Sequence, residues 1–506
     1  MTVAGVREQV ETEVAPPRRR EERPARPSLK PGTIALAGLA IGVLVLVAET
    51  LNRRLSTDVF WQLAAGQWML THHALIGHDP FSYTESHRRW VNDEWGSEVV
   101  LALLFRAIGA AAYNVIAIVT GSVCLICSLA YARALGARGG RLAAIAILLA
   151  LGICNFVTQD RGLSFSLIWL PLELLLLHRA RSNPRWHWGL VPLCVLWVNT
   201  HGSILLGLAV LGIELAWAVL PAGLVERVGG VGRSPHPGAL GLAAAGSLVA
   251  SCISPYGPGL LAYDLSVSRN PQIVASIVEW QSPNFHSTLV LLFFLIPFTV
   301  LAVATRRRPV ALLETTLVIV FLLCALRSER FVIYLMVATV GLVATLPPRP
   351  EWGRLARRVS GAVALGLVVG LLEIPSVPAG SVTTDTPVQV FNFLAAHPGR
   401  IFTQYTWGDY SIARHRQTFA DGRTDLFTGK VLTQFFAVGN VSTDPDPTLL
   451  RYHVDYVVWA RGSALYEYLV HDPRWKVVDR TAPAVVFARR SAWSGMSAPI
   501  GARVLQ

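Results

Sequence analysis

Apolar residues along this chain gather into long runs separated by short polar stretches. Windows of about 20 apolar residues with few charges are typical of helices that cross a membrane. Such windows lie at 33–50, 110–132, 142–158, 162–178, 186–200, 203–222, 238–256, 287–305, 309–326, 330–347 and 359–375. The pattern predicts an α-helical polytopic membrane protein with about 11 transmembrane helices.

The composition excludes an ordinary soluble protein. Of the 506 residues, 53% are hydrophobic and 15% are charged, whereas about a quarter of the residues in typical soluble domains are charged. All six cysteines lie inside apolar runs, so they cannot cross-link an exposed domain. Cys124 and Cys127 form a CxxC pair, but no second ligand pair accompanies it, so no metal site is assigned there.

Charge predicts the orientation of the chain. With 11 spans and a cytoplasmic N-terminus, the arginine-rich loops face the cytoplasm, as the positive-inside bias requires. Treating 186–222 as one span would instead place Arg306 to Arg308 outside, so we keep two spans there. The net charge of +12 is then a topological signal that also favours anionic lipid, and it does not indicate nucleic-acid binding.

The remaining segments complete the predicted organisation. Residues 1–31 are rich in Pro, Arg and Glu and predict a disordered basic cytoplasmic tail. A transmembrane domain follows at 32–376, with a large first outer loop at 52–109. Residues 381–490 alternate strand patterns (401–405, 454–460, 476–479, 484–488) with helical ones (387–396, 430–438, 463–470), which predicts a small extracytoplasmic α/β domain before a tail at 491–506.

The first outer loop is too long and too patterned to be a simple connector. Thr57 is a candidate N-cap for a helix from Asp58 to about Thr71, with Trp61 and Trp68 on one face at head-group depth. A carboxylate at a helix start is favoured by the backbone N–H groups, so Asp58 is either a catalytic acid or a helix-starting residue. Asp93 and Glu94 form a second acidic group, which is either catalytic or simply solvated.

These features together resemble the C-type (GT-C) membrane glycosyltransferases, which transfer sugars from polyprenyl-phosphate donors on the outer face. The resemblance rests on Asp58 after the first span, the aromatic helix, Asp93-Glu94-Trp95 before the second span, and the terminal domain. Short strings are similar to those of a bacterial branch of this superfamily: HDPFSYT (78–84), NDEWGSE (92–98), WVNTHG (197–202), SPYG (254–257), VEWQ (278–281), WGDY (407–410) and DGR (421–423). One departure is that Val59 and Phe60 follow Asp58, where related enzymes often carry a paired acid.

The resemblance implies an inverting hexosyl- or pentosyltransferase of the cell membrane. Asp58 is the expected general base, supported by Asp93 and Glu94. Arginines that can fork onto the departing phosphate are Arg327, Arg330 and Arg161. Candidate contacts to the sugar or the acceptor are Trp61, Asn199, His201, Glu279 and Trp280. The WGDY and DGR strings are candidates for acceptor binding. For each of these residues a purely structural role is the alternative.

The expected partners are a polyprenyl-phosphate-linked sugar, the lipid bilayer and a glycan, lipid or protein acceptor. No nucleotide fingerprint is present, so a sugar nucleotide is not expected as donor. We expect no required cofactor, with a divalent cation as the open alternative because the first loop carries several histidines and acids. Other functions that fit the architecture are a glycan polymerase or ligase, a non-catalytic scaffold and, less well, a secondary transporter.

Overall fold

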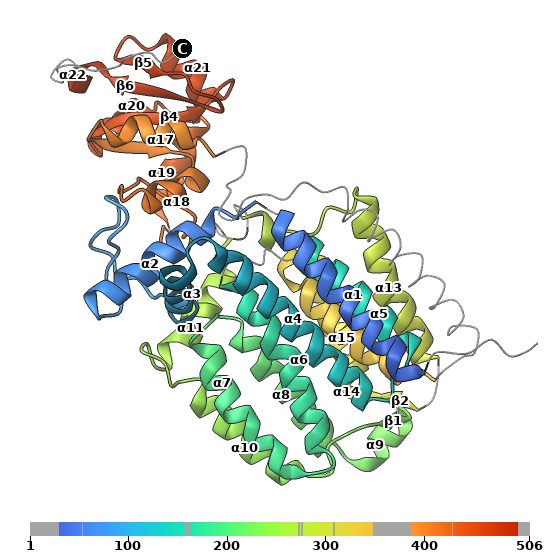
Figure 1. The fold of residues 1–506 in the computed structure, drawn as a ribbon. Coiled ribbons are helices and arrows are strands. Elements are labelled where there is room, and N and C mark those ends of the chain that lie inside the picture. The colour runs from blue at the N-terminus through green and yellow to red at the C-terminus, as the bar shows by residue number, and fades with distance from the viewer. Residues whose placement is uncertain are drawn as a thin grey trace, which may run out of the picture.

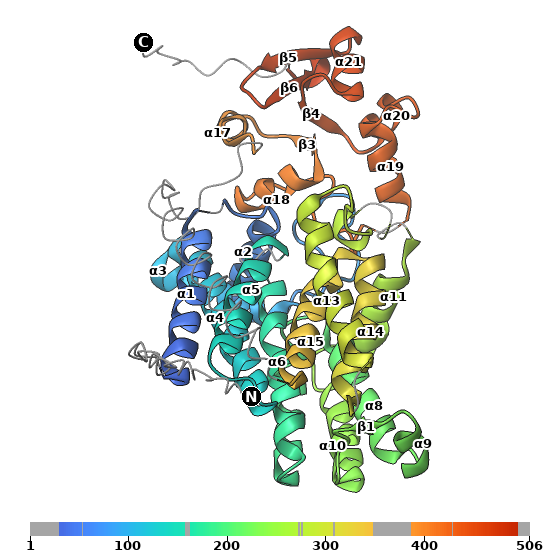
Figure 2. The same cartoon turned by 90° about the vertical axis from the view of Figure 1, so that its right-hand side faces the viewer.

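The computed structural model describes residues 30–52, 54–156, 162–271, 274, 277–306, 309–347, 386–427 and 429–493. A bundle of helices carries the α/β domain at one end, and the two helices α2 (Asp58–His72) and α3 (Trp95–Ile108) lie near the junction (Figures 1 and 2). The first outer loop and the chain's last described segment therefore meet at this end of the bundle.

Helices occupy the predicted apolar windows up to residue 347. They are α1 (Pro31–Asn52), α4 (Ala111–Ala134), α5 (Gly140–Phe156), α6 (Leu163–Ala180), α7 (Leu190–Val198) preceded by η1 (Pro184–Gly189), α8 (Ile204–Val219), α10 (Pro237–Ala250), α13 (Thr288–Thr305), α14 (Leu312–Arg327) and α15 (Val332–Thr345). The predicted break between 186–200 and 203–222 is present. The eleventh window, 359–375, lies outside the described residues.

Two of the described helices, α1 and α4, are long and apolar enough by themselves to cross a membrane. The helices α8 and α10 are apolar but shorter. The number of spans therefore stays a prediction.

Close helix contacts explain why small residues recur in the bundle. A Cβ placed on Gly38 of α1 would lie 2.3 Å from the Cα of Ala143 on α5. One turn later, a Cβ on Gly42 would lie 2.9 Å from Leu125. Small residues of this kind let two backbones approach closely, which is a common way to pack helices in lipid.

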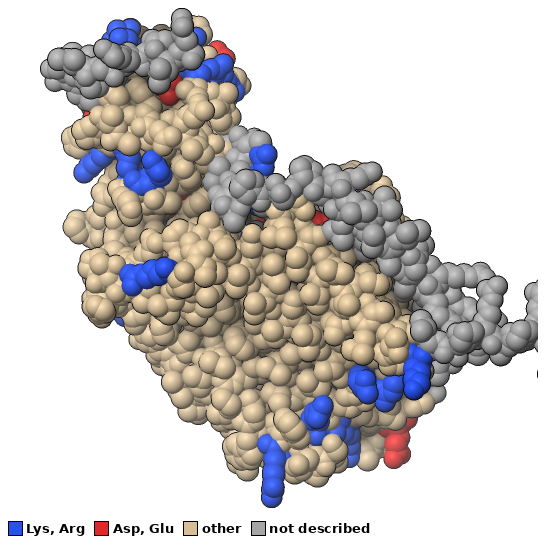
Figure 3. Space-filling view, viewed as in Figure 1, with Lys and Arg blue, Asp and Glu red and all other residues tan. Residues whose placement is uncertain are grey.

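The charges on the bundle lie mainly at one end (Figure 3). On the face shown, Lys and Arg side chains gather at the end away from the α/β domain, and most of the surface between the two ends is uncharged. This distribution is the one that a helical bundle in a membrane requires, because charged side chains are costly at bilayer depth.

Buried acids in the bundle are joined by one arginine. Glu214 and Glu314, which are 1% and 2% exposed, lie 3.4 Å and 3.7 Å from the Arg181 guanidinium. The Tyr131 hydroxyl donates to Glu314 at 2.9 Å. The sequence did not pair these residues, and the structure shows that they tie together four helical segments far from the outer loops.

The α/β domain contains a four-stranded mixed sheet in the order β3-β4-β6-β5. Its strands are β3 (Arg400–Thr403), β4 (Val454–Ala460), β5 (Trp475–Asp479) and β6 (Ala484–Arg489). β3 and β4 are parallel, and β6 pairs antiparallel with both β4 and β5. The helices are α17 (Val388–Ala395), α18 (Tyr405–Ala413), α19 (Lys430–Gly439), α20 (Asp446–Arg451), α21 (Ala464–His471) and α22 (Arg490–Trp493). All strands and helices predicted for this segment are present.

The helix α2 begins and ends almost as predicted and packs against both α3 and α18. Its apolar side meets the domain where Phe60 packs edge-on to Tyr410, with ring centroids 5.2 Å apart. One detail of the prediction is wrong. Thr57 occupies the N-cap position but has helical backbone angles and makes no capping hydrogen bond with its side chain. Helix α2 is therefore held by packing rather than by a cap.

Candidate active site

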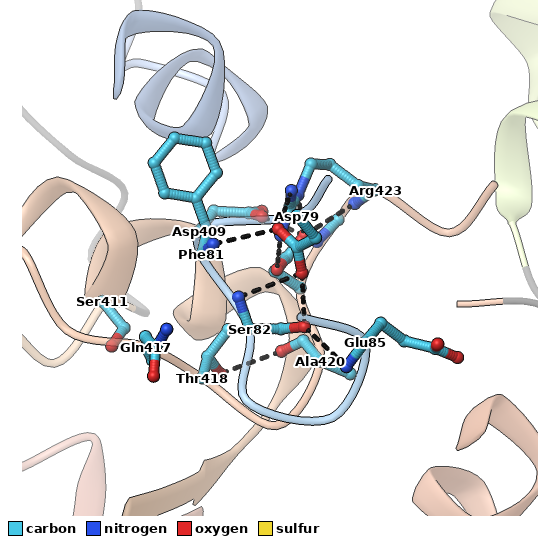
Figure 4. Close-up of polar contacts among 12 residues, drawn as sticks. Asp79, Phe81, Ser82, Glu85, Asp409, Ser411, Gln417, Thr418, Ala420 and Arg423 are labelled. Atoms are coloured by element: carbon cyan, nitrogen blue, oxygen red, sulfur yellow. Dashed lines mark hydrogen bonds and ion pairs between the residues drawn. The ribbon is translucent and has the colours of Figure 1, made fainter. Parts of the chain in front are cut away.

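A buried arginine joins the first outer loop to the α/β domain (Figure 4). Arg423 is only 1% exposed and donates at 2.7 Å to the carboxylates of both Asp79 and Asp421. Its guanidinium also lies over the Trp90 ring, 4.7 Å from the centroid. Buried charges are costly unless they are paired, so each member of this network depends on the others. The HDPFSYT and DGR strings, singled out separately in the sequence, form one ion-pair network.

Backbone pairing extends this junction. The carbonyl of Phe81 accepts the Thr418 N–H at 3.1 Å, and the Tyr83 N–H donates to the Thr418 carbonyl at 3.2 Å. The Tyr83 hydroxyl donates to the Ile401 carbonyl of β3 at 2.8 Å. The Asp79 carboxylate accepts the N–H of Phe81 at 2.9 Å, which holds the loop in its turn. The first outer loop is thus fixed to the domain that carries Gly422.

Two carboxylates meet at Gly422. A Cβ on this glycine would lie 2.8 Å from Oδ1 of Asp58 and 2.9 Å from both carboxylate oxygens of Asp409. The Gly422 N–H also donates to Asp409 at 2.6 Å. Only glycine leaves room for both acids at this point. The start of α2, the middle of α18 and the DGR string therefore build one acidic centre, in which Asp58 is half-buried and Asp409 is fully buried.

The environment of these acids is set by burial and by their proximity. Burial raises the pKa of Asp409 well above its usual range, and the negative charges of Asp58 and Asp421 raise it further. Burial also raises the pKa of Tyr405, with added effects from Asp58, Asp409 and Glu279. Burial and the neighbouring like charges together favour the neutral form of Asp409. The Tyr405 hydroxyl therefore lies close enough to interact electrostatically with Asp58, Asp409 and Glu279.

A second acidic group surrounds Gly202, in the turn between α7 and α8. A Cβ on Gly202 would lie 2.6 Å from Asp93 and 3.0 Å from Asp264 of α11 (Gly259–Arg269). Burial raises the pKa of Asp93 to about 7, and Asp425 adds to this effect. Burial, followed by the charges of Asp93 and Glu94, raises the pKa of Asp264 to about 9. The predicted pair Asp93-Glu94 is therefore part of a larger group whose other members the sequence did not reveal.

This second group predicts that stability falls as pH rises. An acid with a pKa raised by folding binds its proton more tightly when folded, so its contribution is complete below the unfolded value near 4 and is lost by about pH 9. We expect Asp264→Asn, which cannot ionise, to raise the melting temperature at pH 8. The difference from wild type should shrink toward pH 4.5 in a thermal scan of the detergent-solubilised protein. A variant that is less stable than wild type at pH 8 would show that Asp264 stabilises the fold as a carboxylate.

Glu94 and His201, which the sequence assigned to different roles, lie next to each other. His201 Nε2 lies 3.3 Å from Oε1 of Glu94, and the other oxygen of Glu94 accepts a hydrogen bond from Gln62 of α2. Gln62 in turn accepts the Gly162 N–H at 3.1 Å. His201 is 7% exposed, and its Nδ1 accepts the Ser203 N–H. Glu94 is thus held by two side chains, His201 and Gln62, beside the Asp93 group.

The arginines predicted to bind phosphate are placed differently from one another. Arg330, in η3 (Glu329–Phe331), lies 3.4 Å from Glu279 and over the Trp280 ring at 4.8 Å. Its charge also acts on Asp93. Arg327 lies exposed at the end of α14, and Arg161 lies outside the described residues. Of the two described arginines, Arg330 is the one associated with both the acids and the 278–281 string.

Two of the predicted sugar contacts are engaged in packing. The Asn199 side chain donates to the carbonyls of Val195 and Ile253, both at 2.8 Å, and accepts from the indole N–H of Trp95 at 3.1 Å. Asn199 therefore joins α3 to the ends of α7 and α10. Trp61 packs against Trp90, with ring centroids 6.0 Å apart. Direct sugar contact by either residue stays a prediction, as it does for His201, Glu279 and Trp280.

Within the described residues, no group of three or more His, Cys, Asp or Glu side chains has an arrangement able to hold a metal ion. Asp160, which precedes Arg161, lies outside those residues. The expectation that no cofactor is required stays a prediction.

No family model and no curated protein matches the sequence. Solved structures do. The oligosaccharyltransferase AglB from Archaeoglobus fulgidus, in complex with an inhibitory peptide and a dolichol-phosphate, superposes with a TM-score of 0.62 at 11% identity, over 84% of this chain and 69% of that one. ArnT from Cupriavidus metallidurans bound to undecaprenyl phosphate gives a TM-score of 0.53 at 15% identity, over 90% and 97%. Both are GT-C superfamily enzymes.

The chain has the GT-C fold. This confirms the resemblance predicted from the sequence at the level of architecture. At such low identities the likeness fixes the fold and assigns no role to any residue of this chain. The roles of its residues depend on the geometry of this chain itself.

Proposed function

We propose that the chain is an integral membrane glycosyltransferase that moves a sugar from a polyprenyl-phosphate donor to an extracytoplasmic acceptor. The observation that carries this proposal is the meeting of Asp58 and Asp409 at Gly422. This centre lies where the membrane bundle meets the soluble domain, between the compartment of a lipid-borne donor and that of a water-borne acceptor. The solved relatives whose fold this chain shares hold polyprenyl phosphates.

The chemistry assigns different tasks to the two acids. Asp58 accepts the proton of the acceptor hydroxyl as its oxygen forms a bond to the anomeric carbon of the sugar. The bond from that carbon to the phosphate oxygen breaks, and the phosphate leaves with the electron pair. Attack from the face opposite the phosphate inverts the anomeric centre. Burial favours the neutral form of Asp409 beside Asp58, which reduces the competing negative charge near the acceptor proton.

The departing phosphate needs a cation in a site shielded from water. Arg330 is the described arginine best placed for this task, because its guanidinium lies over Trp280 and acts on Asp93, while its partner Glu279 acts on Tyr405 together with Asp58. Glu279, 3.4 Å away, holds the guanidinium while no phosphate is bound. Asp93 and Glu94 then act as orienting residues for the neighbouring turn.

The charge distribution supports an orientation with the N-terminus in the cytoplasm and the α/β domain outside. Lys and Arg gather at the end of the bundle away from this domain, as the positive-inside bias requires (Figure 3). Both acidic groups then face the outer compartment.

A direct test uses the full-length protein in nanodiscs with a panel of undecaprenyl-phosphate monosaccharides as donors and a bacterial cell-envelope extract that supplies glycan, lipid and protein acceptors. We expect time-dependent release of undecaprenyl phosphate with at least one donor, measured by mass spectrometry, and the same rate after treatment with EDTA. Loss of activity on chelation with recovery on adding Mn²⁺ would show that a divalent cation is needed. Release from no member of the panel, by a protein that binds undecaprenyl phosphate, would favour the non-catalytic scaffold.

A further inference from the structure

An open cleft lies on the α/β domain beside the candidate active site. It has a volume of about 740 Å³, within the range of ligand-binding pockets. It is formed by α17, the start of β3, the segment after α18 and one residue of the first outer loop. Its lining residues are Tyr83, Phe391, Leu394, Ala395, Pro398, Gly399, Arg400, Ala413, Arg414, His415, Arg416 and Gln417.

The lining of this cleft is strongly basic. It contains three arginines and a histidine, and no Asp or Glu. The guanidinium of Arg416 donates to the backbone carbonyls of His397 at 3.0 Å and Gly399 at 2.6 Å. That of Arg414 donates to the Asn392 amide oxygen at 3.0 Å. These acceptors are neutral, so they fix the guanidinium groups without cancelling their charge.

One carboxylate lies behind the cleft wall. Asp455 accepts the backbone N–H of Arg400 at 2.8 Å and lies close to Gly399. Among the described lining residues, three guanidinium groups and no carboxylate leave the cleft positive. The guanidinium of Arg400 donates instead to the Tyr452 carbonyl at 3.0 Å and lies over the ring of Tyr83 at 5.1 Å.

The cleft also presents groups that suit a sugar chain. The Tyr83 ring offers an aromatic edge, and the exposed Gln417 amide donates to the Pro80 carbonyl at 3.3 Å, which fixes its direction. Arg400, Arg414 and His415 are exposed toward solvent. Guanidinium forks match the geometry of carboxylate and phosphate groups, whereas an uncharged sugar would use only part of this surface.

The position of the cleft ties it to the acidic centre. Helix α18 carries Asp409 in its middle and ends at Ala413, which lines the cleft. Four residues of helix correspond to a rise of about 6 Å. A chain bound in the cleft would therefore end roughly one helical turn from Asp409.

We propose that this cleft binds an anionic glycan, with sugar units that bear carboxylate or phosphate groups, and presents its end to the acidic centre. The identification of this glycan as the acceptor rests on the proposed transferase function. The binding of an anionic glycan does not rest on that function, so either proposal can be contradicted without the other.

The test measures binding to the full-length protein in nanodiscs of neutral lipid. The probe is fluorescently labelled tetragalacturonate, compared with neutral maltotetraose. We expect tetragalacturonate to bind, and Arg414→Gln and the double variant Arg400→Gln/Arg414→Gln to weaken binding about tenfold or more. Arg451→Gln removes an exposed arginine of the same domain outside the cleft and should leave the affinity unchanged. Asp58→Asn should bind the probe as wild type does, even if it transfers no sugar.

Several results would overturn the proposal. If maltotetraose bound as tightly as tetragalacturonate, negative charge on the glycan would play no part in its recognition. Equal competition by inorganic phosphate would mean that the cleft takes a simple anion rather than a glycan. Binding that is retained in both cleft variants would place the probe elsewhere. Weakened binding in the single variant Arg414→Gln suffices for the proposal if the double variant does not fold.

Discussion

Asp58→Asn is expected to abolish most sugar transfer while leaving the protein folded. Removing a general base typically costs 10²–10⁴-fold in rate, so we expect at least a roughly 100-fold fall in kcat with little change in the KM for the lipid donor. The asparagine keeps the shape of the side chain at the start of α2 but cannot accept the proton. The measurement is the release of undecaprenyl phosphate from the donor that wild type uses.

Glu467→Gln is the matched control for this variant. Glu467 is an exposed carboxylate of α21 in the soluble domain, and its replacement should leave transfer unchanged. The melting temperature of each variant should remain near that of wild type. If Asp58→Asn retains transfer within a few-fold of wild type, Asp58 is not the base.

Arg423→Ala is expected to release the α/β domain from the first outer loop. The substitution leaves Asp79 and Asp421 buried without their shared cation, and such a loss typically costs about 3–5 kcal/mol. We expect a lower melting temperature and faster proteolysis of the segment after residue 386. Transfer should be lost as well, because the Gly422 string would no longer hold Asp409 beside Asp58.

The pH dependence of this variant's stability distinguishes the loss of the ion pairs from the loss of packing on Trp90. Burial without a cation favours the neutral form of Asp421, so the deficit of Arg423→Ala relative to wild type should shrink as the pH falls from neutral toward about 4. Arg461→Ala removes an exposed arginine of the same domain and should have little effect at any pH. A deficit in Arg423→Ala that does not change with pH would point to lost packing on Trp90 instead.

Much of the fold was predictable from local patterns in the sequence. The apolar windows located helices because a segment near 20 residues long with few charges has one favoured structure in lipid. The strands from Val454 and Ala484 were predictable for a similar reason, since buried β-branched runs bounded by turns favour a sheet. The side-chain cap expected at Thr57 was wrong because tertiary packing of α2 on α3 and α18 replaced it.

The candidate site was predictable only in part. Asp58, Asp93 and Glu94 attracted attention because acids beside apolar spans are unusual. Their partners Asp264 and Asp409 could not be assigned, because a single sequence does not show which distant segments meet. The HDPFSYT and DGR strings were recognised as similar to strings of the resembled family. Only the fold shows that Asp79 and Arg423 contact each other.

The separation of Asp79 and Arg423 in the sequence also constrains biosynthesis. They are 344 residues apart, which at ribosomal speeds of 5–20 residues per second corresponds to a delay of roughly 20 to 70 s. During that interval the nascent loop must remain hydrated and open to chaperones or proteases. The junction between the bundle and the α/β domain therefore forms only when translation is nearly finished, and a polypeptide that terminates early would lack it even if every helix of its bundle were inserted.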